Sequence, residues 1–170
     1  MSFQTLVPIN PAAGIPGDFA SVNPRQFLVS GAANQPMVAD ATGVDMARFA
    51  ILNADGTVTS KPAFASVSAT RIGFVHRTAG AALITTWLAE VSMVIPQGRP
   101  VELFATGDFF VKADAITGTP ARGAKVIWDP ATGLINIGAT VGASTVDTGF
   151  VLLSESAVAG QTVIIGKAGA

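Results

Sequence analysis

Short apolar runs divided by turn-forming residues dominate the chain from residue 48 onward. Residues 48–52 are largely apolar, residues 57–60 alternate, and residues 72–76 are rich in β-branched and aromatic side chains. Between the first two runs, Asp55-Gly56 favours a tight hairpin turn, because glycine adopts positive φ at little cost. Runs of this length and composition predict strands at all three places.

The chain beyond residue 98 predicts three more hairpins, each with turn-forming residues between two apolar runs. The predicted turns are Thr106-Gly107-Asp108, residues 129–133 with proline early and glycine late, and residues 156–160. The strand pairs joined by these turns would be 101–105 with 109–113, 124–128 with 134–138, and 149–155 with 161–167. Strands at a spacing of about 8–12 residues predict a mostly β fold, a small antiparallel barrel or sandwich that is SH3-like or similar.

Residues 82–95 fit two kinds of element. Their length suits a helix, but their β-branched residues, with Pro96 and Gly98 after them, favour a long or bent strand. Both interpretations stay open on the sequence.

The first 47 residues predict an extended, irregular arm, in which residues 26–30 are a short strand candidate. Prolines recur there and exclude a long helix, because proline fixes φ and lacks a backbone donor. Apolar side chains still recur through residues 3–22. They are expected in an arm that packs against another protein surface and not in a solvated linker. We therefore divide the chain into an arm, 1–47, and a compact antiparallel β domain, 48–170, with a possible sub-boundary near 96–100.

The chain is close to neutral, and this narrows the classes of partner. Of 170 residues, ten are Lys or Arg and eleven are Asp or Glu, which gives a formal charge of −1. Nucleic-acid binding is not expected, because it needs a basic face. A membrane partner is not expected either, since no run of eighteen apolar residues occurs and the first residues do not form a signal peptide. With no cysteine and little charge, the chain fits a protein that folds in a reducing cytosol and buries surface in an assembly.

The sequence offers no convincing catalytic or cofactor motif. The sequence contains no GxSxG nucleophile elbow whose serine its single histidine, His76, could activate. Strand alternation places His76 on one face with Ile72 and Phe74. Residues 118–125 resemble a phosphate-binding loop, but Lys125 comes one place late and precedes a strand in place of a helix. No metal-binding spacing is present. We therefore expect a half-buried structural or interface histidine, no catalytic residue, no metal and no cofactor.

Acidic and aromatic residues do not favour a sugar-processing site. The tryptophans, Trp87 and Trp128, lie in predicted strands, where core packing is the simpler interpretation, and tyrosine is absent. The carboxylates that could pair as glycosidase acids are scattered, two of them in predicted turns: Asp18, Glu90, Asp108 and Asp129.

Three parts of the chain, taken in order, carry a family resemblance. They are the motif Pro16-Gly17-Asp18-Phe19-Ala20-Ser21 with Asn23-Pro24-Arg25; Gly73–Arg77 with residues 83–87; and residues 98–101 with 106–112 and the hairpin at 123–133. Through these segments most of the chain resembles the structural cement, or capsid decoration, proteins of tailed bacteriophages.

The resemblance implies a non-enzymatic protein on the outer surface of a virion, made in the host cytoplasm. Its partners would be the major capsid protein, which it would bridge between neighbouring capsomers, and itself, as a homotrimer. The extended N-terminal region would help to grip the shell, with neither nucleic acid nor membrane involved. Candidate capsid contacts are Phe3, Ile9, Ile15, Pro16, Gly17, Asp18, Phe19, Asn23, Pro24 and Arg25.

Two other functions remain open on the sequence. A receptor- or carbohydrate-binding β module of a virion surface would show an exposed tryptophan beside acids. A small β-barrel hydrolase would place His76 in a pocket with a nucleophile.

Overall fold

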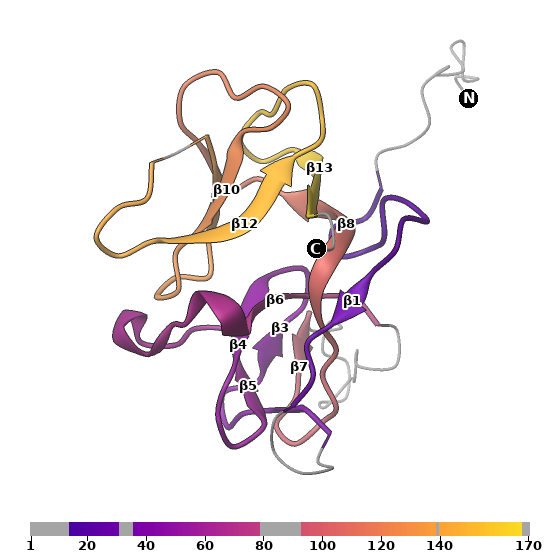
Figure 1. The fold of residues 1–170 in the computed structure, drawn as a ribbon, viewed down its shortest axis with the longest axis vertical. Helices are drawn as coiled ribbons and strands as arrows, with labels where there is room; N and C mark the ends of the chain where they lie inside the picture. Colours follow the sequence, from indigo (N-terminus) through magenta and orange to yellow (C-terminus); the bar gives the residue numbers. More distant parts are fainter. Residues whose placement is uncertain (1–13, 31–35, 79–92, 139, 168–170) are drawn as a thin grey trace, which may run out of the picture.

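The computed structural model describes residues 14–30, 36–78, 93–138 and 140–167, which form strands with almost no helix (Figure 1). The strands of the first half of the chain are β1 Gln26–Phe27, β2 Val38–Ala39, β3 Val44–Asp45, β4 Phe49–Leu52, β5 Thr57–Thr59, β6 Ile72–Val75 and β7 Val94–Ile95. Those of the second half are β8 Leu103–Lys112, β9 Ala115–Ile116, β10 Lys125–Trp128, β11 Ile135–Ile137, β12 Val146–Leu152 and β13 Thr162–Lys167. Two single-turn 3₁₀ helices, Phe64–Ser66 and Ala69–Arg71, complete the described elements, and neither is long enough to cross a membrane.

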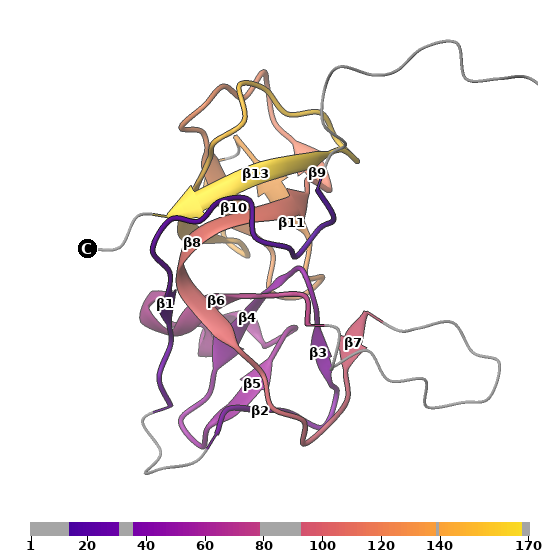
Figure 2. The same ribbon diagram turned by 90° about the vertical axis from the view of Figure 1, so that its right-hand side faces the viewer.

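The strands lie in two halves that share β8. In one sheet the order is β2-β5-β4-β6-β8-β13-β12-β10-β11-β9, with β1 added on β8, and a separate pair joins β3 to β7. Figures 1 and 2 show the N-terminal half (β2 to β7) below, the C-terminal half (β9 to β13) above, and β8 running from one to the other. The prediction of a mostly β, sandwich-like fold is confirmed, and the sheets do not close into a barrel.

The predicted hairpin turn at Thr106-Gly107-Asp108 is wrong, because β8 passes straight through it as one ten-residue strand. The start of β8 pairs with β6 at Leu103 and Phe104, and the rest pairs with β13 from Gly107 onward. Gly107 has a φ of +129°, which other residues rarely adopt. The glycine therefore marks the place where the strand changes partners and not a reversal of the chain.

The other predicted hairpins are confirmed. Strands β10 and β11 pair antiparallel around residues 129–133, and β12 pairs with β13 around residues 156–160. Strands β4 and β5 pair around Asp55-Gly56, where Gly56 has a φ of +86°. Of the ambiguous segment 82–95, only residues 93–95 are described, and they include β7, so the choice between strand and helix for the remainder lies outside the described residues.

Two clusters of buried side chains hold the fold together. The larger one joins the halves through Phe49, Phe74, Phe109, Trp128 and Phe150, all almost fully buried. The second lies within the N-terminal half. Truncating one of these rings to alanine typically costs about 3–5 kcal/mol of unfolding free energy, because it removes buried area and leaves a cavity.

Part of the predicted arm belongs to the sheets. Strands β2 and β3, within residues 36–47, pair with β5 and β7, and Ala39, Val44 and Met46 are buried in the second cluster. The boundaries at 47 and near 96–100 stay predictions.

Candidate functional site

Residues 14–30, called here the N-terminal segment, run antiparallel along β8 (Figure 2). Gly17 N–H donates to the Phe110 carbonyl at 2.7 Å, Phe110 N–H donates to the Asp18 carbonyl at 3.0 Å, and Ala20 N–H donates to the Asp108 carbonyl at 2.9 Å. Further along, β1 pairs with β8 at Phe104 and Thr106. The segment is thus an added edge strand, interrupted between Ser21 and Arg25.

The interruption is organised by the carboxylate of Asp108. Ser21 Oγ and Asn23 Nδ2 both donate to Asp108 Oδ2 at 2.6 Å, and Asn23 N–H donates to Ser21 Oγ at 3.1 Å. Hydrogen bonds to a carboxylate are about twice as strong as those between neutral groups. One acid of β8 therefore fixes the loop in which Asn23, Pro24 and Arg25 are exposed.

A stack of three side chains fixes the same segment to the N-terminal half. The Arg25 guanidinium lies 3.7 Å from the centroid of the Phe19 ring, and the Phe19 and His76 ring centroids are 4.0 Å apart with planes at 14°. Burial lowers the pKa of His76 below its usual value, against the opposing pull of Asp18 and Glu102. The imidazole is therefore neutral at neutral pH and packs as an aromatic ring under Phe19.

The start of the segment is locked by close backbone packing. Arg77 N–H donates to the Gly17 carbonyl at 3.0 Å, and the Asp18 carboxylate pairs with the Arg77 guanidinium at 3.6 Å. Gly17 has a φ of +95°, and a Cβ there would lie 2.8 Å from Arg77 Cβ. Only glycine fits this approach.

The structure therefore separates the predicted contact residues into two kinds. Gly17 is buried, and Asp18 and Phe19 are half-buried against Arg77 and His76, so these residues position the segment. Exposed members are Ile15, Asn23, Pro24 and Arg25, with Pro16 half-buried; Phe3 and Ile9 lie outside the described residues.

Three exposed apolar residues in the segment were not among the predicted contacts. Val22 is 96% exposed, Val29 is 83% exposed, and Phe27 is 53% exposed although its ring lies 4.4 Å from that of Phe104. Residues 27 and 29 alternate along the predicted strand 26–30, and this alternation could have indicated them. The sequence alone does not show that their side of the strand is uncovered.

Two hollows flank the exposed loop of the segment. A groove of about 890 Å³ lies between Asn23–Gln26 and the strands β12 and β13. A second hollow, of about 520 Å³, lies between the segment and the strands β6 and β8, lined by Val22, Phe27, His76 and Glu102 among others. The loop thus projects as a ridge with space on both sides.

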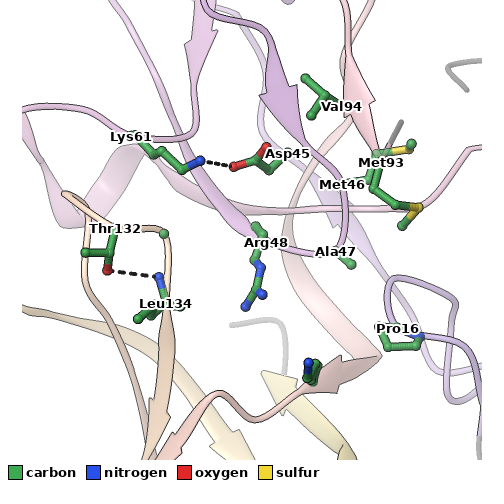
Figure 3. Close-up of a pocket in the computed structure, with 12 residues that line it drawn as sticks. Pro16, Asp45, Met46, Ala47, Arg48, Lys61, Met93, Val94, Thr132 and Leu134 are labelled. Atoms are coloured by element: carbon green, nitrogen blue, oxygen red, sulfur yellow. Dashed lines mark hydrogen bonds and ion pairs between the residues drawn. The ribbon is translucent and has the colours of Figure 1, made fainter. Parts of the chain in front are cut away.

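A further cavity of about 420 Å³ lies between the loop after β3, the start of β7, the end of β8 and the tip of the β10–β11 hairpin (Figure 3). Its charges are largely paired: Lys61 Nζ lies 2.9 Å from Asp45 Oδ2, and Arg48 forms an ion pair with Asp114. Met93 and Leu134 add exposed apolar surface. The described lining holds no histidine, and its one hydroxyl, that of Thr132, accepts from Leu134 N–H within the hairpin, so it does not favour acid–base or nucleophilic catalysis.

The described tryptophan and carboxylates that the sequence offered for sugar binding or catalysis have structural roles. Trp128 is fully buried in the core, which removes it as an exposed sugar platform, and Trp87 and Glu90 lie outside the described residues. Asp108 binds the segment, and Asp129 Oδ1 accepts from Ala131 N–H within its predicted turn. Within the described ranges, no three His, Asp or Glu side chains gather into a group that could hold a metal ion.

Comparison with known proteins gives the context for this surface. The sequence model of the XM1 gp53 minor capsid protein family matches residues 3–167. The chain belongs to this family. The family is one of structural capsid proteins, so the chain has a structural role in a phage capsid, associates with other capsid components and is located in the virion.

A solved structure shows the same fold. A chain of the structure entitled "The capsid of Myoviridae Phage XM1" superposes with a TM-score of 0.60 at 16% identity, over 98% of this chain and 97% of that chain. No curated protein sequence matches significantly. The predicted resemblance to phage capsid-associated proteins is thus confirmed, and the match includes the entire N-terminal segment.

Proposed function

We propose that this family member is a cement protein, which binds the outer surface of the capsid as a homotrimer and bridges neighbouring major capsid proteins. The observation that carries the proposal is the concentration of exposed apolar side chains on the N-terminal segment. Four of the nine large exposed apolar side chains in the described residues lie there: Ile15, Val22, Phe27 and Val29. Exposed apolar groups that cluster in this way are typical of interaction surfaces.

The segment suits attachment to a shell because it is positioned without being covered. It is anchored by hydrogen bonds to Asp108 and by the Arg25–Phe19–His76 stack, and these contacts leave the ridge around Asn23 and Pro24 exposed. The exposed residues Ile15, Val22, Asn23, Pro24 and Arg25 are the proposed direct contacts. Phe3 and Ile9 remain proposed contacts that precede the described segment.

Bridging gives the protein its stabilising effect. A ligand that binds the assembled shell and not its separated subunits stabilises assembly by about 2.7 kcal/mol per site at a free concentration of 100 times its Kd. Several arms in one trimer multiply modest affinities through their high effective concentration. Because the chain carries few charges, we expect attachment to weaken little as salt is raised.

Mixing the purified protein with undecorated capsids tests the proposal. We expect electron microscopy to show the protein on the outer surface at positions where capsomers meet, and decorated capsids to survive heating better than bare ones. The proposal fails if the intact protein neither binds nor protects capsids.

Single substitutions locate the contact. Val22→Asp is expected to weaken capsid binding at least about tenfold, because a charge would be buried in an apolar contact. Val158→Asp is the matched control, since Val158 is also exposed, at 54%, but lies in the C-terminal half. No loss of binding in Val22→Asp, or an equal loss in both variants, would contradict a contact at Val22.

A further inference from the structure

The groove of about 890 Å³ beside the ridge has a floor of regular geometry. Along β12, Phe150 and Leu152 are buried in the core, whereas Gly149, Val151 and Leu153 alternate with them and line the groove. Successive residues of a strand are about 3.4 Å apart, so the floor from Gly149 to Leu153 is about 14 Å long. The groove therefore offers an uncharged strip as long as a five-residue extended segment.

A cation lies at each end of this strip. At one end, a Cβ on Gly149 would lie 3.0 Å from Lys167 Nζ, and Lys167 forms no ion pair among the described residues. At the other end, Gly123 N–H donates to the Leu152 carbonyl at 2.8 Å, which places Arg122 nearby. Both Lys167 and Arg122 line the groove.

The carboxylates near the groove do not neutralise these two cations. Asp108 Oδ2 accepts the two hydrogen bonds described above, and Asp147 pairs with Lys125 at 2.8 Å. Glu155 lies 3.5 Å from Arg122, but both side chains are largely exposed, and such a pair contributes little. The groove therefore has positive charge available at both ends.

We propose that this groove binds an extended acidic segment of the shell, with carboxylates at positions i and i+4 and an apolar side chain at i+2. The inference rests on the proposed function and adds the chemistry of the partner. In an extended segment these three side chains share one face, and the outer two are about 14 Å apart, like the ends of the strip. The carboxylates then meet Lys167 and Arg122, and the apolar side chain lies over Val151.

The spacing and the position of the groove both favour this partner. In a helix, residues i and i+4 are separated by a rise of only about 6 Å, so a helical segment would not reach both cations. Asn23 and Pro24 also line the groove, so a segment that lies in it contacts the ridge as well.

Capsid binding by full-length charge variants tests the groove. Arg122→Glu and Lys167→Glu each turn one attraction into a repulsion, and we expect each to weaken binding to undecorated capsids at least about tenfold. Arg122→Lys keeps the charge and should retain binding. The matched control is Arg99→Glu, which makes the same charge change at an exposed position of the N-terminal half. Circular dichroism checks that each variant is folded.

The outcomes separate the groove from the proposed function. If the intact protein decorates capsids and both folded groove variants do so equally well, the groove proposal is overturned and the proposed function stands. An equal loss in Arg99→Glu also overturns it, because the charge would then not act through the groove. If the intact protein does not bind capsids, the proposed function fails and the groove loses its partner with it.

Nuclear magnetic resonance with peptide probes tests the spacing. The blocked peptide Glu-Ser-Val-Ser-Glu, at millimolar concentration, should shift the amide signals of residues 149–153 in the intact protein and much less in Arg122→Glu. Lys-Ser-Val-Ser-Lys should leave these signals unchanged, and Glu-Glu-Val-Ser-Ser, which has the same composition with adjacent acids, should shift them less. No shift with the first peptide, or equal shifts with all three, overturns the proposal.

Discussion

Strand β8 has two long neighbours that are held to it in different ways. Strand β13 pairs with it over six consecutive residues, from Thr162 opposite Lys112 to Lys167 opposite Gly107, and buries Val163 and Ile165 beneath the pair. The N-terminal segment contacts β8 through scattered backbone bonds, the Asp108 carboxylate and ring contacts with Phe104 and Phe109, and it leaves Val22 and Val29 exposed. The first neighbour buries its apolar side chains in the core, and the second leaves several of its own exposed.

The largest change in unfolding free energy is expected from truncating a buried side chain of β13. Ile165→Ala should lower the unfolding free energy by about 2–5 kcal/mol, because Ile165 is fully buried and its truncation leaves a cavity. Urea unfolding followed by circular dichroism measures the change. Ile164→Ala, at a half-buried position of the same strand, is the control and should cost less. Equal losses would show that the alternation of burial does not decide stability here.

A local effect is expected when the carboxylate anchor is removed. Asp108→Ala removes the acceptor of Ser21 and Asn23, and hydrogen bonds to charged groups contribute about 1.5–3 kcal/mol each in favourable settings. We expect faster amide hydrogen exchange at residues 18–25, while exchange in β13 changes less. Asp129→Ala, which removes a turn acceptor between β10 and β11, is the control. Unchanged exchange in the segment would contradict the anchoring role.

A smaller loosening of the N-terminal segment is expected when Arg25 is removed from the Arg25–Phe19–His76 stack. Arg25→Ala should loosen the segment by about 0.5–1 kcal/mol, the usual strength of an exposed cation–π contact. Amide exchange at Phe19 and Ala20 measures it. Arg122→Ala serves as the control, since Arg122 pairs only loosely with Glu155 at 3.5 Å on the exposed surface.

The smallest effect concerns pH. Because burial lowers the pKa of His76 in the folded state, the unfolded state binds a proton first as the pH falls below about 6.5, and folding loses free energy in that window. Asp18 and Glu102 oppose this shift, whereas Arg25 and Arg77 reinforce it. We expect stability to fall slightly more between pH 7 and 5.5 in the intact protein than in His76→Phe, which retains a ring under Phe19. Identical pH profiles would show that His76 does not contribute.

Local patterns were enough to predict most of the fold. The hairpins around Asp55-Gly56 and residues 129–133 depend on short-range turn chemistry, which is complete within a few residues of sequence. Thr106-Gly107-Asp108 has the same chemistry but was misassigned, because the pairing of β8 with β6 and β13 is non-local and carries the strand through. Glycine permits a turn, but tertiary pairing decides whether one forms.

The candidate site was predictable in outline only. The motif from Pro16 to Arg25 marked a segment that the structure places along β8, but the sequence could not show which of its side chains face inward. Phe19 finds His76 across more than fifty residues, and Ser21 finds Asp108 across 87. Such contacts depend on the register between the segment and β8, which no short pattern encodes.

The direction in which the N-terminal segment lies on β8 has a mechanical consequence. Antiparallel backbone bonds run perpendicular to the strands, so tension applied along the segment would load several of these bonds in shear at once. A pull across the strands would instead open them one after another, like a zipper. Tension along the segment would therefore pass into β8, which pairs with strands of both halves of the fold.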